Sequence, residues 1–229
     1  MKSSLPLALL ALLLLPVSPS LGQVTVQSRF SVNNASDLFF DGSGPSDFQE
    51  FFTLGNFNTT GTASTESGID VVTTQNSTVT ESLFEIETFS DAGLSSTDSF
   101  TESIILLSVD FDVASPVTYL LEGTFSVLEG EDGFDSISVT LEDQDAPFNE
   151  SIFSIRGPDN SQDVFSESGV LLPGSYFFDF NSSISSFAPD RGPITSSDLS
   201  LIFATIPEPS ALTLCWGLLA VIATRRNRA

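Results

Sequence analysis

The sequence predicts an all-β domain, a β-sandwich, for the central part of the chain. Apolar and polar residues alternate with a period of two in several segments, which places the apolar side chains of each strand on one face. The three- and four-residue spacing of an amphipathic helix is scarcely visible there. Stretches rich in Ser, Thr, Gly and Asp separate these segments, as turns separate short strands. This pattern is typical of a sandwich, and a jelly roll is the narrower form that it allows.

The expected strands follow from the alternation. In the longest run, apolar residues from Ile105 to Val113 share one face, while Ser108, Asp110 and Asp112 take the other. The same pattern predicts strands at 24–32, 117–127, 137–141, 176–180 and 199–203.

A long loop is expected between the strands at 24–32 and 105–113. Residues 41–68 are rich in Gly, Ser and Thr, which favour loops. We expect this loop to be packed by the phenylalanines within it, namely Phe48, Phe51, Phe52 and Phe57.

The 229 residues suffice for one domain with a substantial core. We expect three segments: a signal peptide at 1–22, an acidic extracellular β-sandwich at 23–206 and a sorting tail at 207–229. Cys215, the only cysteine, lies in the tail, so the domain is expected to be held by its core without a disulfide.

Residues 1–22 have the pattern of a secretory signal peptide. Lys2 supplies the positive charge, and the apolar run Leu5–Leu15 falls within the usual length of about 7–15 residues. Ser20 and Gly22 are the small residues that precede a cleavage site, so we expect cleavage between Gly22 and Gln23. A retained membrane anchor is the less favoured alternative, because the run is too short to span a bilayer comfortably.

The other end of the chain predicts a short transmembrane helix at about 210–224. The helix follows Pro207-Glu208-Pro209 and precedes Arg225, Arg226 and Arg228. Such a helix would be about 22 Å long, against about 30 Å for the hydrocarbon core, and snorkelling arginines can cover part of the difference. The arginines are expected to stay on the cytoplasmic side and to stop translocation, which leaves the acidic domain outside. A buried core helix is the alternative.

These elements resemble the PEP-CTERM sorting signal of Gram-negative bacteria, a segment that is also labelled an ice-binding protein C-terminal domain. The resemblance covers only about residues 206–228. It implies that Pro207, Glu208 and Pro209 form the motif recognised by an exosortase, a membrane-embedded processing enzyme. Arg225 and Arg226 match the basic stop of the family. The resemblance further implies passage through the inner membrane, removal of the tail and delivery to the cell surface or matrix.

The charge of the chain excludes one class of partner. The protein has 7 basic and 30 acidic residues, for a net charge of −23. All 30 carboxylates but only three arginines lie between Gln23 and Pro209. Nucleic-acid binding depends on basic groups, so no nucleic-acid partner is expected, whereas cations, cationic polymers and neutral sugars remain candidates.

The residue types of the expected domain exclude several kinds of catalysis. Histidine is absent from the chain, the sole lysine is Lys2, and Cys215 lies in the tail. A nucleophilic triad needs an imidazole or amine base, and common zinc and iron sites need histidine or cysteine. No catalytic residue is therefore assigned. A carboxylate pair acting on polysaccharide remains the enzymatic alternative.

Calcium is the one cofactor that the composition invites, because it takes clustered oxygen ligands. Glu129, Glu131, Asp132 and Asp135 concentrate four carboxylates between two expected strands, and they are the candidate ligands. A second cluster contains Glu142, Asp143 and Asp145. Neither matches the EF-hand spacing, and the alternative in both cases is a solvated loop.

These observations favour a non-enzymatic surface or extracellular-matrix protein of a Gram-negative bacterium, sorted through its tail into an exopolysaccharide-rich envelope. The alternatives are a carboxylate-dependent polysaccharide-active enzyme and an adhesion module that binds calcium, sugar or ice.

We predict that Gln23 is the first residue of the exported protein, because Ser20 and Gly22 satisfy the small-residue rule. Peptide mass mapping of the surface fraction should find a peptide that begins at Gln23. Peptides spanning the Gly22–Gln23 bond in that fraction would contradict the prediction.

Overall fold

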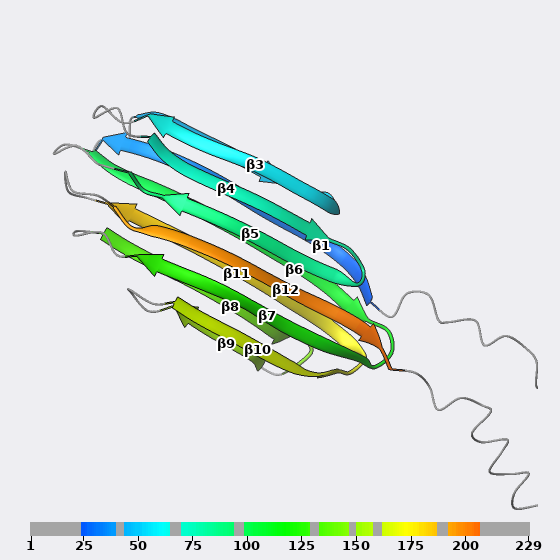
Figure 1. Ribbon diagram of the computed structural model, residues 1–229. Helices are drawn as coiled ribbons and strands as arrows, with labels where there is room; N and C mark the ends of the chain where they lie inside the picture. The colour runs from blue at the N-terminus through cyan, green and yellow to red at the C-terminus, as the bar shows by residue number, and fades with distance from the viewer. Residues whose placement is uncertain are drawn as a thin grey trace, which may run out of the picture. The chain divides into compact units, whose positions relative to one another are not determined.

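The computed structural model describes residues 24–39, 44–64, 70–93, 99–128, 133–146, 150–157, 162–186 and 192–206. These residues form twelve β-strands and no helix. The strands make two antiparallel six-stranded sheets that pack face to face (Figure 1), so the predicted all-β sandwich is confirmed. No helix among the described residues is long and apolar enough to cross a membrane. The helix predicted at 210–224 lies outside the described residues.

The first sheet, sheet A, has the strand order β2-β1-β6-β11-β8-β9. Its strands are β1 (Val24–Phe39), β2 (Ser46–Phe51), β6 (Ser99–Val113), β8 (Gly133–Asp143), β9 (Glu150–Gly157) and β11 (Gly174–Ser186). The second sheet, sheet B, has the order β10-β7-β12-β5-β4-β3. Its strands are β3 (Gly55–Ser64), β4 (Asp70–Val79), β5 (Leu83–Asp91), β7 (Val117–Leu128), β10 (Gln162–Leu171) and β12 (Ile194–Thr205).

The strand order is nested over the last eight strands. In sheet A, β11 lies between β6 and β8, and in sheet B, β12 lies between β5 and β7. From β5 to β12 the chain changes sheet at every connection except the one from β8 to β9. This nested order is jelly-roll-like. The four N-terminal strands widen the sandwich, because β1 and β2 extend sheet A beyond β6 while β3 and β4 extend sheet B beyond β5.

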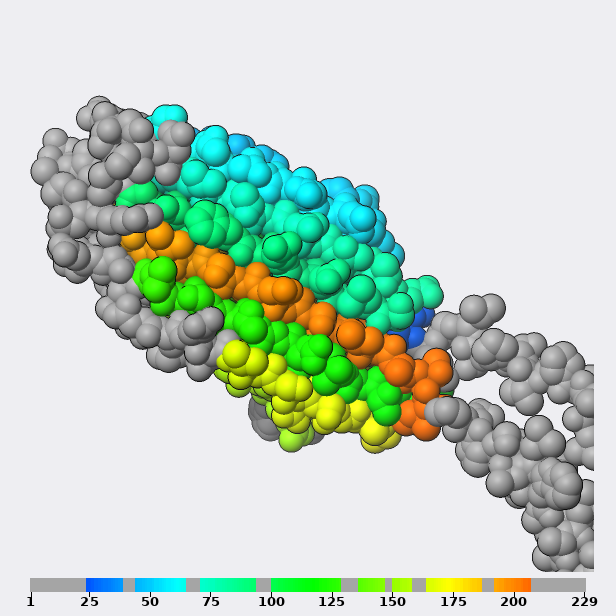
Figure 2. Space-filling view, in the orientation of Figure 1, coloured from blue at the N-terminus to red at the C-terminus, as the bar shows by residue number. Residues whose placement is uncertain are grey.

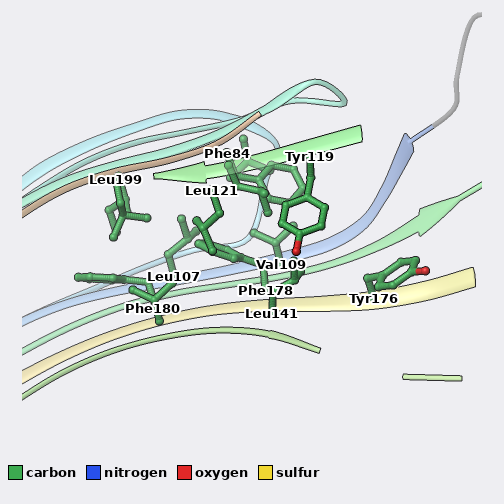
Figure 3. Packing of buried hydrophobic residues seen from close by; sticks show 14 of the residues in the cluster. Phe84, Leu107, Val109, Tyr119, Leu121, Leu141, Tyr176, Phe178, Phe180 and Leu199 are labelled. Carbon is green, nitrogen blue, oxygen red and sulfur yellow. The ribbon is translucent and has the colours of Figure 1, made fainter. Parts of the chain in front are cut away.

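The apolar core lies between the two sheets and contains the residues that alternation predicted. Every second residue of β6 from Ile105 to Val113 is at most 3% exposed. Leu121 and Leu199 of sheet B face Leu107 and Phe180 of sheet A in this layer (Figure 3). The predicted strands at 105–113, 117–127, 137–141, 176–180 and 199–203 therefore point their apolar residues inward, as expected.

Phe84 on β5 lies at the centre of an aromatic cluster in this core. Its ring centroid is 5.2 Å from that of Phe111, 5.1 Å from that of Phe203 and 6.0 Å from that of Phe178. Phe111 and Phe203 meet the Phe84 ring edge-on, which is a preferred geometry for aromatic pairs. Phe84 is fully buried and contacts rings of β6 and β11 in sheet A as well as β12 in sheet B, so it ties strands of both sheets together.

Much of the remaining interior is polar, beside a small apolar cluster of Ala35, Ala63 and Val71. Inward-facing positions toward the ends of β6, β11, β5 and β12 carry hydroxyl groups, and β1 and β4 carry amide and hydroxyl groups. Ser103 donates a hydrogen bond to Ser90 across the sheets at 2.9 Å, and Ser182 and Thr195 make another at 3.2 Å. The two sheets are therefore joined by apolar packing over one part of their interface and by hydrogen bonds over the other.

The structure corrects the loop predicted at 41–68. This segment contains β2 and β3, which are edge strands of sheets A and B. Phe51 and Phe57 stack on each other in the interior with their centroids 5.0 Å apart, whereas Phe48 and Phe52 are exposed. The prediction was wrong because Ser, Thr and Asn occupy strand positions here, so the segment lacks an apolar alternation.

Side chains of β2 close one side of the sandwich onto β3. Asp47 Oδ2 accepts a hydrogen bond from the backbone N–H of Thr62 at 3.3 Å. Gln49 Nε2 donates to the carbonyl oxygen of Thr60 at 3.3 Å, and Thr59 Oγ1 donates to Gln49 Oε1. These contacts engage backbone groups on the edge of β3 that faces away from β4.

We predict that Phe84→Ala lowers the free energy of unfolding by about 3–5 kcal/mol, the usual cost of a buried Phe→Ala change. The matched control is Phe89→Ala on the same strand, where the side chain is 39% exposed; its effect should be smaller, about 1 kcal/mol, because less apolar surface is lost. Urea unfolding of both variants measures the difference. Equal losses in the two variants would contradict the described orientation of β5.

Candidate functional site

The structure describes little of the predicted sorting and calcium sites. Gly22 and Gln23, the Pro207–Pro209 motif and the terminal arginines lie outside the described residues, as do Glu129, Glu131 and Asp132. Asp135 lies in β8, where its backbone is opposite Ile184 of β11. These site assignments remain predictions from the sequence.

The second acidic cluster forms a turn between β8 and β9. Asp143 Oδ1 accepts hydrogen bonds from the backbone N–H groups of Asp145 and Ala146, at 2.9 and 3.2 Å. Asp145 Oδ2 accepts one from the N–H of Ser175 at 2.9 Å, which fastens the turn to the start of β11. Within the described part of the chain, no group of three or more acidic, His or Cys side chains is placed to hold a metal ion. Asp143 and Asp145 thus have a structural role in this turn.

The outer face of sheet A carries an acidic stripe over β6 and β11. Asp110 and Asp112 accept hydrogen bonds from Ser28 and Gln27 of β1, at 2.5 and 2.7 Å. Asp112 also accepts one from Ser175, at 2.8 Å. The carboxylates of this stripe are therefore held by neutral donors of the neighbouring strands, and their negative charge is not cancelled by those contacts.

Two carboxyl groups on this face have raised pKa values. Burial raises the pKa of Asp179, the nearby charge of Glu142 raises it further, and the hydrogen bond from Ser108 at 2.6 Å lowers it. Burial alone raises the pKa of Glu102. In both groups the missing hydration of the charged form is the main cause.

The outer face of sheet B, shown in Figure 2, contains a shallow depression over β12 and its neighbours. Its volume is about 420 Å³, and its lining includes the exposed carboxylates of Glu85, Glu122 and Asp198. Asp198 lies directly opposite Glu87 on β5, and Ser200 lies opposite Glu85. The depression thus gathers carboxylates and hydroxyl groups on an exposed sheet surface.

Most of the described aromatic side chains lie in the core, and a few are exposed. Tyr119 and Tyr176 are buried, and burial raises the pKa of both phenols. Phe48 and Phe52, which were expected to pack a loop, are 56% and 63% exposed. Phe52 contacts Phe30 with ring centroids 5.3 Å apart. Phe48 lies on β2 and Phe52 directly follows it, so their exposure becomes visible only once this edge strand is known.

Arg29 is buried between the sheets at 2% exposure. Its guanidinium donates to the carbonyl oxygen of Gly55 at 2.5 Å, to Ser77 at 2.6 Å and to Ser31 at 3.1 Å. It also lies 5.1 Å from the ring centroid of Phe51, within range of a cation–π contact. Burial lowers the pKa of Arg29 to about 10, so the side chain remains charged at neutral pH.

Comparisons with known proteins show no family for this chain. No family model matches it, and no curated protein is significantly similar. A carbohydrate-binding module, titled "CBM4 structure and function", aligns with a TM-score of 0.25 and 12% identity, covering 57% of this chain and 75% of its own.

Two further solved structures align at a similar level. The enzymatically active domain of tailspike protein 4 from bacteriophage CBA120 has a TM-score of 0.27 and 12% identity, covering 80% of this chain and 20% of its own. A protein of Broad Bean Stain Virus has a TM-score of 0.24 and 13% identity, covering 84% of this chain and 96% of its own. TM-scores this low carry no argument about function.

We predict that Asp179→Asn makes the protein more stable at pH 7. A carboxyl whose pKa is raised on folding contributes stability below its unfolded pKa, and this contribution is lost as the pH rises through the folded pKa. The gain from Asn should therefore shrink as the pH is lowered from 7 toward 4. Urea unfolding across this range, with exposed Asp198→Asn as the control, tests the prediction. A gain that is independent of pH would contradict it.

Proposed function

We propose that this protein is an exported, non-enzymatic component of the surface or extracellular matrix of a Gram-negative bacterium. It is sorted through its C-terminal tail, passes through the inner membrane and is processed by an exosortase-type enzyme. The observation that carries the proposal is the order of three elements at the C-terminus: Pro207-Glu208-Pro209, an apolar span and a group of arginines. The apolar run of a signal peptide near Met1 supports the same route.

The surface of the sandwich is compatible with display outside the cell. Arg156 is the only exposed basic side chain among the described residues, because Arg29 is buried. Both outer faces carry carboxylates, on the stripe of sheet A and in the depression of sheet B. Such a surface stays soluble and repels polyanions, which favours a neutral or cationic polysaccharide over an anionic polymer as its surroundings.

The arrangement of carboxylates in the described residues does not favour the enzymatic alternative. Glycoside hydrolysis by two carboxyl groups uses one acid with a raised pKa beside a second carboxylate in a substrate cleft. Glu102 and Asp179, whose pKa values are raised, lie on sheet A. The depression with Glu85 and Asp198 lies on sheet B. The carboxyl groups with raised pKa values therefore lie on one sheet and the depression lies on the other.

The ice-binding alternative would need a regular array of threonines on a flat strand face. The outer face of β3 and β4 places Thr60 opposite Thr74, but Asn58 lies opposite Asn76 and Asn56 lies opposite Thr78. Asparagine thus interrupts the row of threonines, and the arrangement does not favour ice binding.

The proposal predicts different failures for two changes in the tail. Replacing Arg225, Arg226 and Arg228 with Gln should weaken retention and release unprocessed protein. Each arginine costs about 2.5–3.5 kcal/mol to bring to the bilayer centre on insertion scales. Replacing Pro207, Glu208 and Pro209 with Ala should leave the protein inserted and uncut, because prolines keep the recognition segment extended and outside the helix.

Cell fractionation with antibodies to the sandwich and to the tail separates these outcomes. Pro173→Ala, in the turn between β10 and β11, is the matched control for loss of an exposed proline and should be processed normally. If the triple-alanine variant reaches the surface without its tail as efficiently as the unchanged protein, the sorting proposal is wrong.

A further inference from the structure

Asp37 is a buried carboxylate that no described basic side chain neutralises. It lies near the end of β1, its side chain is 3% exposed, and Oδ1 has no hydrogen-bond partner. Its backbone N–H is used, since it donates to the carbonyl oxygen of Pro45 at 2.9 Å. An ionised carboxylate that is removed from water without a partner carries a large free-energy penalty. The groups around Asp37 must therefore show what stabilises its charge.

Two more unpartnered oxygens lie beside Asp37. In the register of sheet A, Asp37 is opposite Thr101 of β6, and Thr101 is opposite Ser186 of β11. Thr101 and Ser186 are 0% and 1% exposed, and their Oγ atoms also lack partners. One carboxylate oxygen and two hydroxyl oxygens, each without a hydrogen-bond partner, therefore belong to one inward-facing row across three adjacent strands.

No basic side chain of the described residues can neutralise Asp37. Arg29 is eight residues away on the same strand, about 26 Å along it, and is bound to Ser77 and Gly55. Arg156 is exposed on β9, the edge strand at the far side of sheet A. Arg191, the third arginine of the domain, lies outside the described residues. Within the described part of the chain, the charge that balances Asp37 is left to a proton or to a small cation.

We propose that Asp37, Thr101 and Ser186 form a binding site for a hard cation between the sheets. Carboxylate and hydroxyl oxygens are the ligand types that calcium and sodium take, and water completes such a shell readily. The strongly negative field of the chain concentrates cations at its surface, which favours occupancy. The site differs from the one predicted at Glu129–Asp135, and it does not depend on the proposed route of export.

The cation should stabilise the folded protein, because the site is assembled only when β1, β6 and β11 pair. Full-chain protein is treated with EDTA, and its Tm is measured while CaCl2 is added. Calcium at about 100 times its Kd should raise Tm by about 5–10 °C. A parallel titration with NaCl, against choline chloride at equal ionic strength, identifies sodium as the cation if calcium has no effect.

Four variants locate the effect. Asp37→Asn keeps the shape of the side chain but should abolish the cation-dependent rise in Tm. The exposed control Asp198→Asn should keep the full rise, and so should Glu131→Gln combined with Asp132→Asn in the other candidate loop. Thr101→Val, which removes the hydroxyl at nearly constant shape, should weaken cation affinity about tenfold or more in calorimetric titration and shows the site even if Asp37→Asn folds poorly.

Several results would overturn the proposal. One is the absence of any rise in Tm with either cation; another is a full rise in Asp37→Asn. A third is an Asp37→Asn variant that is more stable than the unchanged protein at every cation concentration, because this result would show that Asp37 is neutralised by a proton. A rise that disappears only in the Glu131/Asp132 variant would move the cation to that loop.

Discussion

The two sheets are held together by side chains that point inward at every second residue, and each sheet can bury its apolar face only against the other. The row from Ile105 to Val113 shows the constraint most clearly, because its inward residues are almost completely buried while Asp110 and Asp112 between them reach the outer face. A shift of one residue in β6 would exchange the two sets and place aspartates in the core. Since the only cysteine lies outside the described sandwich, this packing carries the stability that disulfides supply in many exported domains.

The four N-terminal strands are packed against each other largely through buried polar groups. Where β1 faces β4, the interior contains Arg29, Gln75 and Ser77 in place of the leucines and phenylalanines found between β6 and β12. A buried network of this kind is directional, since each donor must meet its acceptor. It therefore fixes the position of β1 and β4 more narrowly than apolar contacts would, at the cost of desolvating the guanidinium, which is seen in its lowered pKa.

The alternation of apolar residues was enough to predict the sandwich and five of its core strands. It could not predict β2 and β3, because their inward positions include Asp47, Gln49 and Gly61, which do not form an apolar stripe. The nested strand order depends on contacts between distant segments, which a local pattern does not contain. For the same reason the burial of Asp37 beside Thr101 and Ser186 was invisible, since three strands far apart in the sequence contribute one residue each.

The hydrogen bonds from Asp47 and Gln49 to β3 have a consequence for contacts between copies of this domain. An unprotected edge strand offers free N–H and C=O groups to a strand of any neighbouring molecule, and such pairing propagates into aggregates. Here the free edge of β3 is already occupied at Thr60 and Thr62 by side chains of its own chain. A second copy could extend sheet B past β3 only by first displacing these contacts. Neighbouring copies can therefore contact each other along this edge without pairing their strands into one continuous sheet.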